Sequence, residues 1–260
     1  CLALKVILFI LREFPASMVD KSINCVTMFM SSEVIKIEKT PVGDDTRNFL
    51  PPDINGEAAA FMMMNRNKKG IALNLKDKDG VEIFKKMVEN SDVVLENFRK
   101  GTLEKLGIGY DVMSKINPKI ILCEISGYGR TGPYADKGGF DLVAQGMSGL
   151  MSITGESKDR PPMKVGAPIT DITAGLLATS GILAALVHRN KTGEGQKVDT
   201  SLFEAGIVHT YWQSAIAGAT GYVGLELIKI LSKHSRVRIL YLCAKKSCVN
   251  YNISLTRLQM

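Results

Sequence analysis

The stretch "KKGIALNLKDKDGVEIFKKMVENSDVVLENF", residues 68–98, predicts the fold class of this chain. Its first part, "KKGIALNLK", is typical of a strand, and "DVVLENF" at its end is typical of another. Between them, "DKDGVEIFKKMVENS" predicts an amphipathic helix with Val81, Phe84 and Met87 on one face. A strand, a helix and a second strand in this order indicate an α/β domain.

The same alternation continues on both sides of this stretch. Further strands are expected in "SEVIKIEK" (32–39), in "KIILCEISGYG" (119–129) and at the start of 195–217, which continues as a helix. A long helix is expected over 174–189. Together these segments predict a largely parallel sheet, in which ligands bind at the carboxyl ends of the strands. Those ends carry "ENFRKG" and "ISGYGRTGP".

Composition limits the classes of function. The 260 residues are 45% hydrophobic and 23% charged, as in a soluble globular protein, with a net charge of +7. That charge suits anionic partners, and phosphate-bearing cofactors are favoured over nucleic acid because basic and aromatic residues are not interleaved. The three histidines have no metal-ligand spacing, so no metal site is expected.

Cysteine usage and the first residues bear on location. Five dispersed cysteines fit a reducing compartment, and we expect a cytoplasmic protein, or a mitochondrial matrix protein in a eukaryote. Cys123 is expected in the core. The opening "CLALKVILFI" is too short to span a bilayer, so no membrane association is expected. A buried strand is favoured there over a signal-peptide core, because no cleavage site clearly follows.

A single carboxylate, Asp171, stands in "VGAPITDITAGLLATSGILAALVHR" (165–189) among small and apolar residues. It could cap a helix that begins near Thr173, since capping aspartates accept backbone N–H groups. The same position suits a nucleophile, because a helix N-terminus stabilises a carboxylate and Gly166 and Gly175 would let a bulky substrate approach. The spacing alone leaves both interpretations open.

Two basic loops are candidates for phosphate binding. "ENFRKG" (96–101) places Asn97 and Arg99 after a strand, and "NRNKKG" (65–70) places Arg66 and Lys69 before one. Each loop could be an ordinary solvated turn. Together they would form a basic rim at the edge of the sheet, which suits a phosphate-rich ligand.

An ordered series of motifs resembles the class III CoA-transferases. They are "SEVIKIEK", "GDDTR", "NRNKKGIALNLK", "VVLENFRKGTLEKLGIGY", "ISGYGRTGPYADKGGFD", "MSGLMSITG", "GAPITDITAGLLATSGILAAL" and "RNKTGEGQKVDTSLFEA", over roughly 31–217. The resemblance implies a Rossmann-like α/β large domain. It also implies that Asp171 is the nucleophile and that coenzyme A, bound as acyl-CoA, is the ligand. The coenzyme A contacts that the resemblance implies are Asn97, Phe98 and Arg99 in one loop, Arg66 and Lys69 at the phosphates, and Tyr128 and Gly129 facing the thioester.

The implied reaction moves CoA from an acyl-CoA, such as succinyl-CoA, to a small carboxylic acid through an aspartyl anhydride and an aspartyl-CoA thioester, without metal or ATP. Racemases of the same family have a histidine where this chain has Phe140, so transferase chemistry is favoured over α-proton exchange. An inactive CoA-binding fragment is a further alternative. The family forms interlocked homodimers, so a homodimer is expected of a full-length member.

The two ends of the chain depart from the family. Residues 1–30 are divergent, and we expect 1–217 to be a truncated large domain. The tail 218–260 resembles the start of the N-acetyl-γ-glutamyl-phosphate reductases, through Gly218, Gly221 and Gly224 of a GxxGxxG turn. No strand precedes these glycines, so we expect an unrelated tail that binds no NADP and forms no independent domain.

Overall fold

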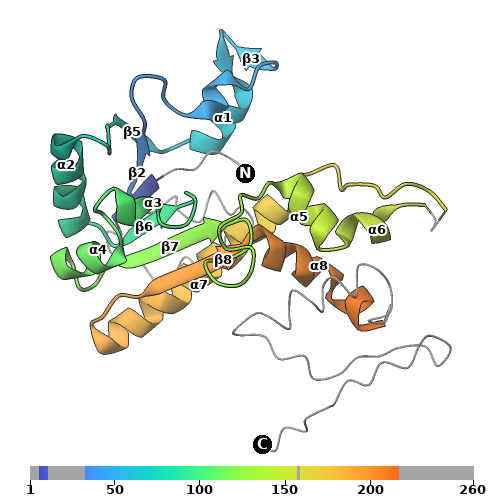
Figure 1. Ribbon diagram of the computed structural model, residues 1–260. Helices are drawn as coiled ribbons and strands as arrows, with labels where there is room; N and C mark the ends of the chain where they lie inside the picture. Colours follow the sequence, from blue (N-terminus) through green and yellow to red (C-terminus); the bar gives the residue numbers. More distant parts are fainter. Residues whose placement is uncertain (1–5, 11–32, 157–158, 217–260) are drawn as a thin grey trace, which may run out of the picture. The chain divides into compact units, whose positions relative to one another are not determined.

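A computed structural model describes residues 6–10, 33–156 and 159–216 (Figure 1). These residues form two compact units. The first unit comprises the described residues up to Ser126 together with Gly175–Thr200, and the second comprises Gly127–Ala174 and the described residues from Ser201 onward. The predicted tail, 218–260, and most of the divergent segment 1–30 lie outside the described residues, so both stay predictions.

The elements follow the alternation expected from the sequence. In chain order they are β1 (Val6–Ile10), β2 (Glu33–Glu38), the short 3-10 helix η2 (Asp45–Asn48), β3 (Asp53–Ile54), β4 (Glu57–Ala58), α1 (Ala59–Asn65), β5 (Lys69–Ala72), α2 (Lys78–Glu89), β6 (Val93–Glu96), α3 (Thr102–Lys105), α4 (Tyr110–Ile116), β7 (Ile121–Ser126), α5 (Asp141–Met147), α6 (Leu150–Thr154), α7 (Ile169–Thr192), β8 (Lys197–Ser201) and α8 (Leu202–Ile216). The α/β prediction is confirmed.

The main sheet of the described residues has the strand order β5-β2-β1-β6-β7-β8. β2 pairs in parallel with β5, and β6 pairs in parallel with β7. β1 is antiparallel to both of its neighbours, β2 and β6, so the expectation of a largely parallel sheet is wrong at β1. An apolar run predicts a strand but not its direction, because backbone donors and acceptors can pair either way.

Helices cover both faces of this sheet in the first unit. Helices α2, α3 and α4 bury Phe84, Leu103 and Met113 against one face, and α7 packs on the other (Figure 1). Phe84 is fully buried, as its place on the predicted apolar face requires. Cys123 in β7 is also fully buried, and burial raises the pKa of its thiol to about 12, so its predicted place in the core is confirmed.

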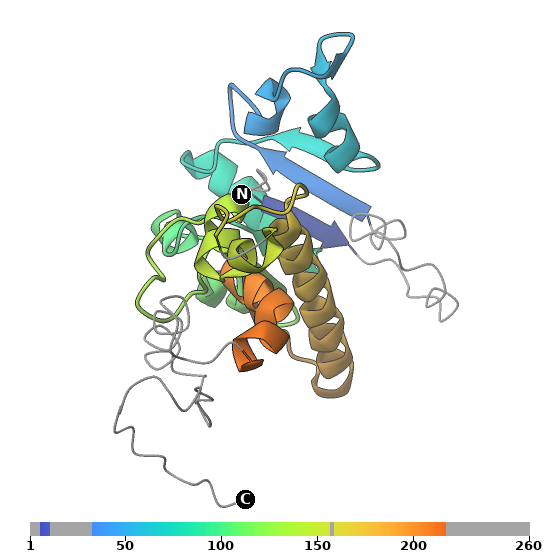
Figure 2. The same ribbon diagram turned by 90° about the vertical axis from the view of Figure 1, so that its right-hand side faces the viewer.

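Helix α7 is long and apolar enough to cross a bilayer by length and composition alone (Figure 2). This is weak evidence for a membrane span, because the core helix of a soluble protein passes the same test. Ala178, Ile182 and Ala185 of this helix are buried against the sheet. A Cβ atom at Gly181 would come within 2.6 Å of Val198 Cγ1 in β8. One face of α7 therefore packs against the sheet.

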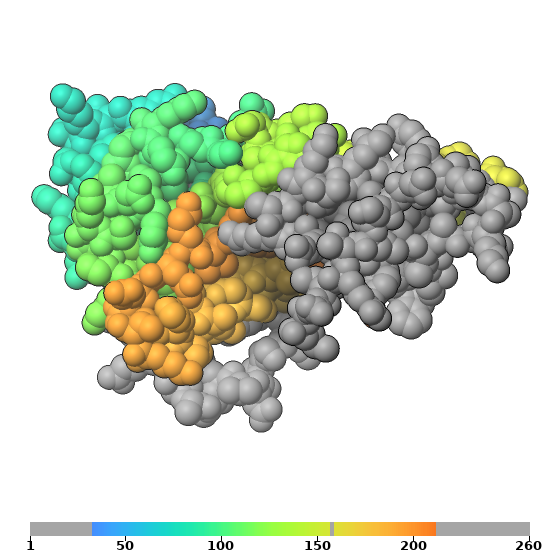
Figure 3. All heavy atoms as spheres, turned by 60° about the horizontal axis from the view of Figure 1, so that its bottom comes forward, coloured from blue at the N-terminus to red at the C-terminus, as the bar shows by residue number. Residues whose placement is uncertain are grey.

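The chain turns after α7 and runs directly against the segment that leads into β7 (Figure 3). The Gly195 N–H donates to the Pro118 carbonyl at 2.8 Å. A Cβ atom at Gly195 would lie 1.9 Å from the Ile120 carbonyl oxygen. Only a glycine fits here without moving backbone, because no flexible side chain can give way.

We predict that Gly195→Ala lowers the free energy of unfolding by about 3 kcal/mol, at the upper end of the usual range for overpacking. Gly70→Ala is the matched control, because the nearest atom to its new Cβ is Glu38 Oε1 at 3.9 Å. Urea unfolding of the two variants and the unaltered chain measures the difference. Equal stability of all three would show that the turn relaxes without cost.

Candidate active site

Helix α7 begins at Ile169, so it starts earlier than the sequence suggested. Asp171 consequently lies inside the first turn of the helix, half-buried, and does not cap it. The capping interpretation is therefore wrong. Its physical reason is that acceptors from other residues already serve the first backbone N–H groups: the Ile169 N–H donates to the Ala167 carbonyl at 2.8 Å, and Ile172 donates to Pro168 at 3.0 Å.

The acceptor for the backbone N–H of Thr170 comes from α5. Oδ1 of Asp141 accepts the Thr170 N–H at 2.9 Å and the Thr170 hydroxyl at 2.8 Å. Oδ2 of Asp141 accepts from the Gln145 side-chain amide at 2.7 Å. Sequence reasoning missed Asp141, although a carboxylate at the start of a helix, two residues after a glycine pair, was a usable signal.

The turn that contains Tyr128 and Gly129 lies in the same unit as Asp171. Gly127 and Gly139 touch backbone to backbone there, since a Cβ on Gly127 would lie 2.6 Å from the Gly139 Cα. This contact ties the turn to the segment that leads into α5 and Asp141. The structure thus brings three of the predicted site residues, Tyr128, Gly129 and Asp171, into one compact unit.

Aromatic packing holds Tyr128 in place. Its ring meets Tyr134 edge-on, with centroids 5.4 Å apart, and Phe203 at a tilt, 6.0 Å away. Burial and the neighbouring Tyr134 raise the pKa of the Tyr128 hydroxyl. The hydroxyl therefore stays protonated at neutral pH and can donate a hydrogen bond. Gly129 has φ +86°, which a residue with a side chain rarely adopts.

The turn after β6 lies in the first unit and carries Asn97, Phe98 and Arg99. Glu96 is almost fully buried, and its Oε2 accepts the Phe98 N–H at 2.6 Å. The Phe98 ring packs against the apolar core. Asn97 is half-buried and Arg99 is exposed. The buried carboxylate and the anchored ring therefore fix the turn and leave the Arg99 guanidinium available to a ligand.

Arg66 and Lys69 do not join this turn. Strands β2, β5 and β6 run in one direction, because β5 is parallel to β2 while β2 and β6 are both antiparallel to β1. Arg66 and Lys69 stand at the amino end of β5, whereas Arg99 follows the carboxyl end of β6. The single basic rim expected from the sequence is therefore wrong. Lys69 is paired with Glu33 at 2.5 Å, and Arg66 is exposed.

A hollow of about 410 Å³ lies instead at the carboxyl ends of β2 and β5. It is lined by Glu38, Lys39, Pro41, Val42, Gly43, Arg47, Gly70, Ile71 and Ala72. The Arg47 guanidinium donates to both oxygens of Glu38, at 2.9 and 3.1 Å, and lowers the pKa of that carboxyl group. Lys39 pairs with Asp45 at the surface. This hollow opens on the same edge of the sheet as the Arg99 turn.

A buried ion pair lies next to the residues that line this hollow. Lys36 of β2 and Asp44 are both buried and bonded to each other, and Lys36 also donates to Asn65 Oδ1 at 2.9 Å. Lys68 lies beside them, 3.5 Å from the same amide oxygen. Burial, and then the charge of Lys36, lower the pKa of Lys68 to about 8. The alternating pattern of β2 did not reveal that Lys36 is buried.

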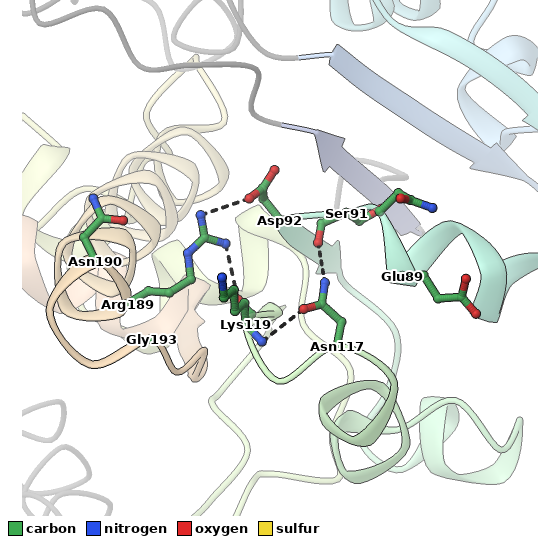
Figure 4. A pocket seen from close by; sticks show the side chains of 9 residues that line it. Glu89, Ser91, Asp92, Asn117, Lys119, Arg189, Asn190 and Gly193 are labelled. Carbon is green, nitrogen blue, oxygen red and sulfur yellow. Dashed lines mark hydrogen bonds and ion pairs between the residues drawn. The ribbon is translucent and has the colours of Figure 1, made fainter.

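A second hollow, about 570 Å³, lies at the amino ends of β6 and β7 (Figure 4). Arg189 crosses it, donating to Asp92 at 2.9 Å and to the Lys119 carbonyl at 3.3 Å. Asn117 donates to the Ser91 carbonyl at 2.8 Å. These bonds join α7 and the strand ends, and no predicted site residue lines the hollow. Among the described residues no group of three His, Cys, Asp or Glu could hold a metal ion.

The lowered pKa of Lys68 predicts a pH dependence. Between pH 8 and 10.5 the unfolded chain keeps a proton that the folded chain has released, so the destabilisation caused by this charge disappears as pH rises. Replacing the charge in Lys68→Met should therefore stabilise the protein most below pH 8. The gain over the unaltered chain should shrink up to pH 10.5. Urea unfolding of both proteins across this range tests it, and a pH-independent difference would contradict it.

Comparisons with known proteins bear on this arrangement. The family description "CoA-transferase family III" matches residues 30–247. Succinyl-CoA:glutarate CoA-transferase of Mus musculus is 44% identical over 178 residues, covering 68% of this chain and 41% of the relative. Succinate–glutarate CoA-transferase of Agrobacterium fabrum is 44% identical over 181 residues, covering 67% and 45%.

Solved structures agree with the relatives. A CAIB/BAIF family protein from Brucella suis superposes with a TM-score of 0.67 at 42% identity, covering 70% of this chain and 49% of that one. A Mycobacterium tuberculosis protein, Rv3272, gives the same TM-score at 30% identity. The chain spans less than half the length of the curated relatives named above.

Proposed function

The chain belongs to CoA-transferase family III, and on this premise we propose that it transfers CoA from an acyl-CoA to a carboxylate acceptor through a covalent intermediate on Asp171. The observation that carries the proposal is the place of Asp171 in the first turn of α7, half-buried, in the unit that also holds the Tyr128–Gly129 turn. The positive end of a long helix stabilises the negative charge that a carboxylate nucleophile must keep.

The proposed chemistry balances without another reactant. An oxygen of the Asp171 carboxylate attacks the thioester carbonyl; the C–S bond breaks and its electron pair leaves with the CoA thiolate, giving an aspartyl acyl anhydride. The thiolate then attacks the aspartyl carbonyl, which releases the donor acid and leaves an aspartyl-CoA thioester. The acceptor carboxylate repeats both steps in reverse order. After each step one carbonyl remains activated as an anhydride or a thioester: first that of the donor, then that of Asp171, and finally that of the acceptor.

Binding of coenzyme A is proposed at the carboxyl edge of the sheet in the first unit. Glu96 accepts a backbone N–H of the turn Asn97–Arg99, and the Phe98 ring packs on the core. These contacts fix the exposed groups of the turn before a ligand binds. Arg99 would meet a phosphate, and the neighbouring hollow at β2 and β5 adds Lys39 and Arg47 to the same edge. The sheet direction does not support the proposed phosphate contacts of Arg66 and Lys69.

The substrate class is proposed from the relatives. The name of the mouse relative pairs succinyl-CoA with glutarate, and that of the Agrobacterium relative pairs succinate with glutarate. We therefore propose succinyl-CoA, or a similar acyl-CoA, as the donor and a dicarboxylate as the acceptor for this chain.

The decisive experiment traps the intermediate. The protein is incubated with succinyl-CoA, treated with hydroxylamine, and digested for mass spectrometry. We expect a hydroxamate on Asp171, because hydroxylamine attacks an activated aspartyl carbonyl. In Asp171→Asn we expect no hydroxamate and no CoA transfer, with coenzyme A affinity unchanged. A modification on another residue, or one that persists in the variant, would remove Asp171 from the mechanism.

A related prediction concerns Phe140, which stands before α5 and is 63% exposed. A phenyl ring cannot take a proton from the acyl α-carbon, so this chain should not exchange that hydrogen with solvent. A chiral 2-methylacyl-CoA incubated in deuterium oxide with the protein should keep both its hydrogen and its configuration. Measurable deuterium uptake would favour racemase chemistry instead.

A further inference from the structure

We propose that Asp141 and Gln145 form a positioning pair that fixes the direction of the Asp171 carboxylate during acyl transfer; this inference rests on the proposed role of Asp171. Both residues belong to α5, one turn apart, and Gln145 is fully buried. Neither touches the acyl group in the proposal. They act through the backbone that precedes Asp171.

The pair is hydrogen-bonded to both ends of the segment that precedes Asp171, residues 165–170. Near the start of the segment, the Val165 N–H donates to Gln145 Oε1 at 2.8 Å. At its end, the N–H and the hydroxyl of Thr170 both donate to Asp141 Oδ1. Thr170 is fully buried and is the residue directly before Asp171. A shift of either α5 side chain would therefore move the peptide that carries the nucleophile.

The hydrogen bonds that join Thr170, Asp141, Gln145 and Val165 fix which side chain donates and which accepts. Asp141 must accept on both oxygens, from Thr170 on one side and from the Gln145 NH₂ on the other at 2.7 Å. Gln145 must donate to Asp141 and accept from Val165. A carboxylate at 141 with an amide at 145 satisfies every bond. An amide at both positions would bring two NH₂ groups together in a buried site.

Placement of a nucleophile affects its rate of attack more than the binding of substrate. A misplacement of about 1 Å can lower a rate by about 100-fold, because the reacting atoms no longer meet in line. The turn Asn97–Arg99 proposed to bind coenzyme A lies in the first unit, and none of the proposed contacts, Tyr128 and Gly129 included, belongs to α5. Loss of the positioning pair should consequently lower kcat and leave coenzyme A affinity unchanged.

The test compares four proteins: the unaltered chain, Asp141→Asn, Gln145→Glu, and the double variant Asp141→Asn/Gln145→Glu. The single variants put two donors or two carboxylates side by side. In the double variant the new carboxylate accepts from both the new amide and Val165, so these bonds are restored with the same net charge. The longer bond from the Gln145 amide to the Ala167 carbonyl, 3.4 Å, is lost. Glu156→Gln, which alters an exposed carboxylate paired loosely with Arg160, is the control.

The readouts are the single-turnover rate of hydroxamate formation on Asp171 and coenzyme A affinity by calorimetry. We expect the single variants to form the hydroxamate about 10- to 100-fold more slowly, with unchanged affinity, and the double variant to recover most of the rate. Equal rates in all variants would overturn the positioning role, as would a double variant no better than the singles. Absence of an Asp171 hydroxamate in the unaltered chain would instead overturn the proposed function itself.

Discussion

The first turn of α7 leaves backbone N–H groups without partners inside the helix, and acceptors in the second unit serve those of Ile169, Thr170 and Ile172. Oδ1 of Asp141 takes the Thr170 N–H, and the carbonyls of Ala167 and Pro168 take two more. Because these acceptors come from outside the helix, Asp171 does not have to cap it. In the proposed function this carboxylate acts at the positive end of a long helix, which stabilises its charge.

The same acceptor connects the segment before Asp171 with the turn of Tyr128 and Gly129. Asp141 is the first residue of α5, and the backbone of Gly139, two residues before it, touches that of Gly127. The contact in turn fixes the turn of Tyr128 and Gly129. Short-range contacts thus link three segments that are distant in sequence: the Tyr128–Gly129 turn, the start of α5 and the start of α7.

Much of this fold could be predicted from the sequence because its apolar periods are strong. The fully buried Phe84 and the strand of Cys123 followed directly from the pattern. The direction of β1 could not, since strand pairing is symmetric with respect to an apolar run. Helix α1 was not predicted, because its apolar run is only a few residues long.

The candidate site could be predicted only where it depends on residues that are neighbours in the sequence. The position of Asp171 before an apolar helix was informative, but its N-cap interpretation failed because Asp141, a distant residue, supplies the acceptor. The basic rim failed for a similar reason: a loop before a strand and a loop after one lie at opposite edges of a sheet. The buried pair Lys36–Asp44 depends on tertiary packing, which residue type alone does not encode.

The central claim is that Asp171 itself becomes acylated, and transfer of an oxygen atom tests it most directly. If the acceptor acid attacks an aspartyl-CoA thioester, one oxygen of the acceptor remains on the aspartate after turnover. With an acceptor carrying heavy oxygen in its carboxylate, peptide mass spectrometry should find the heavy isotope in the Asp171 side chain. Turnover that leaves Asp171 unlabelled would mean that the acceptor attacks the acyl-CoA directly, and the covalent account would be wrong.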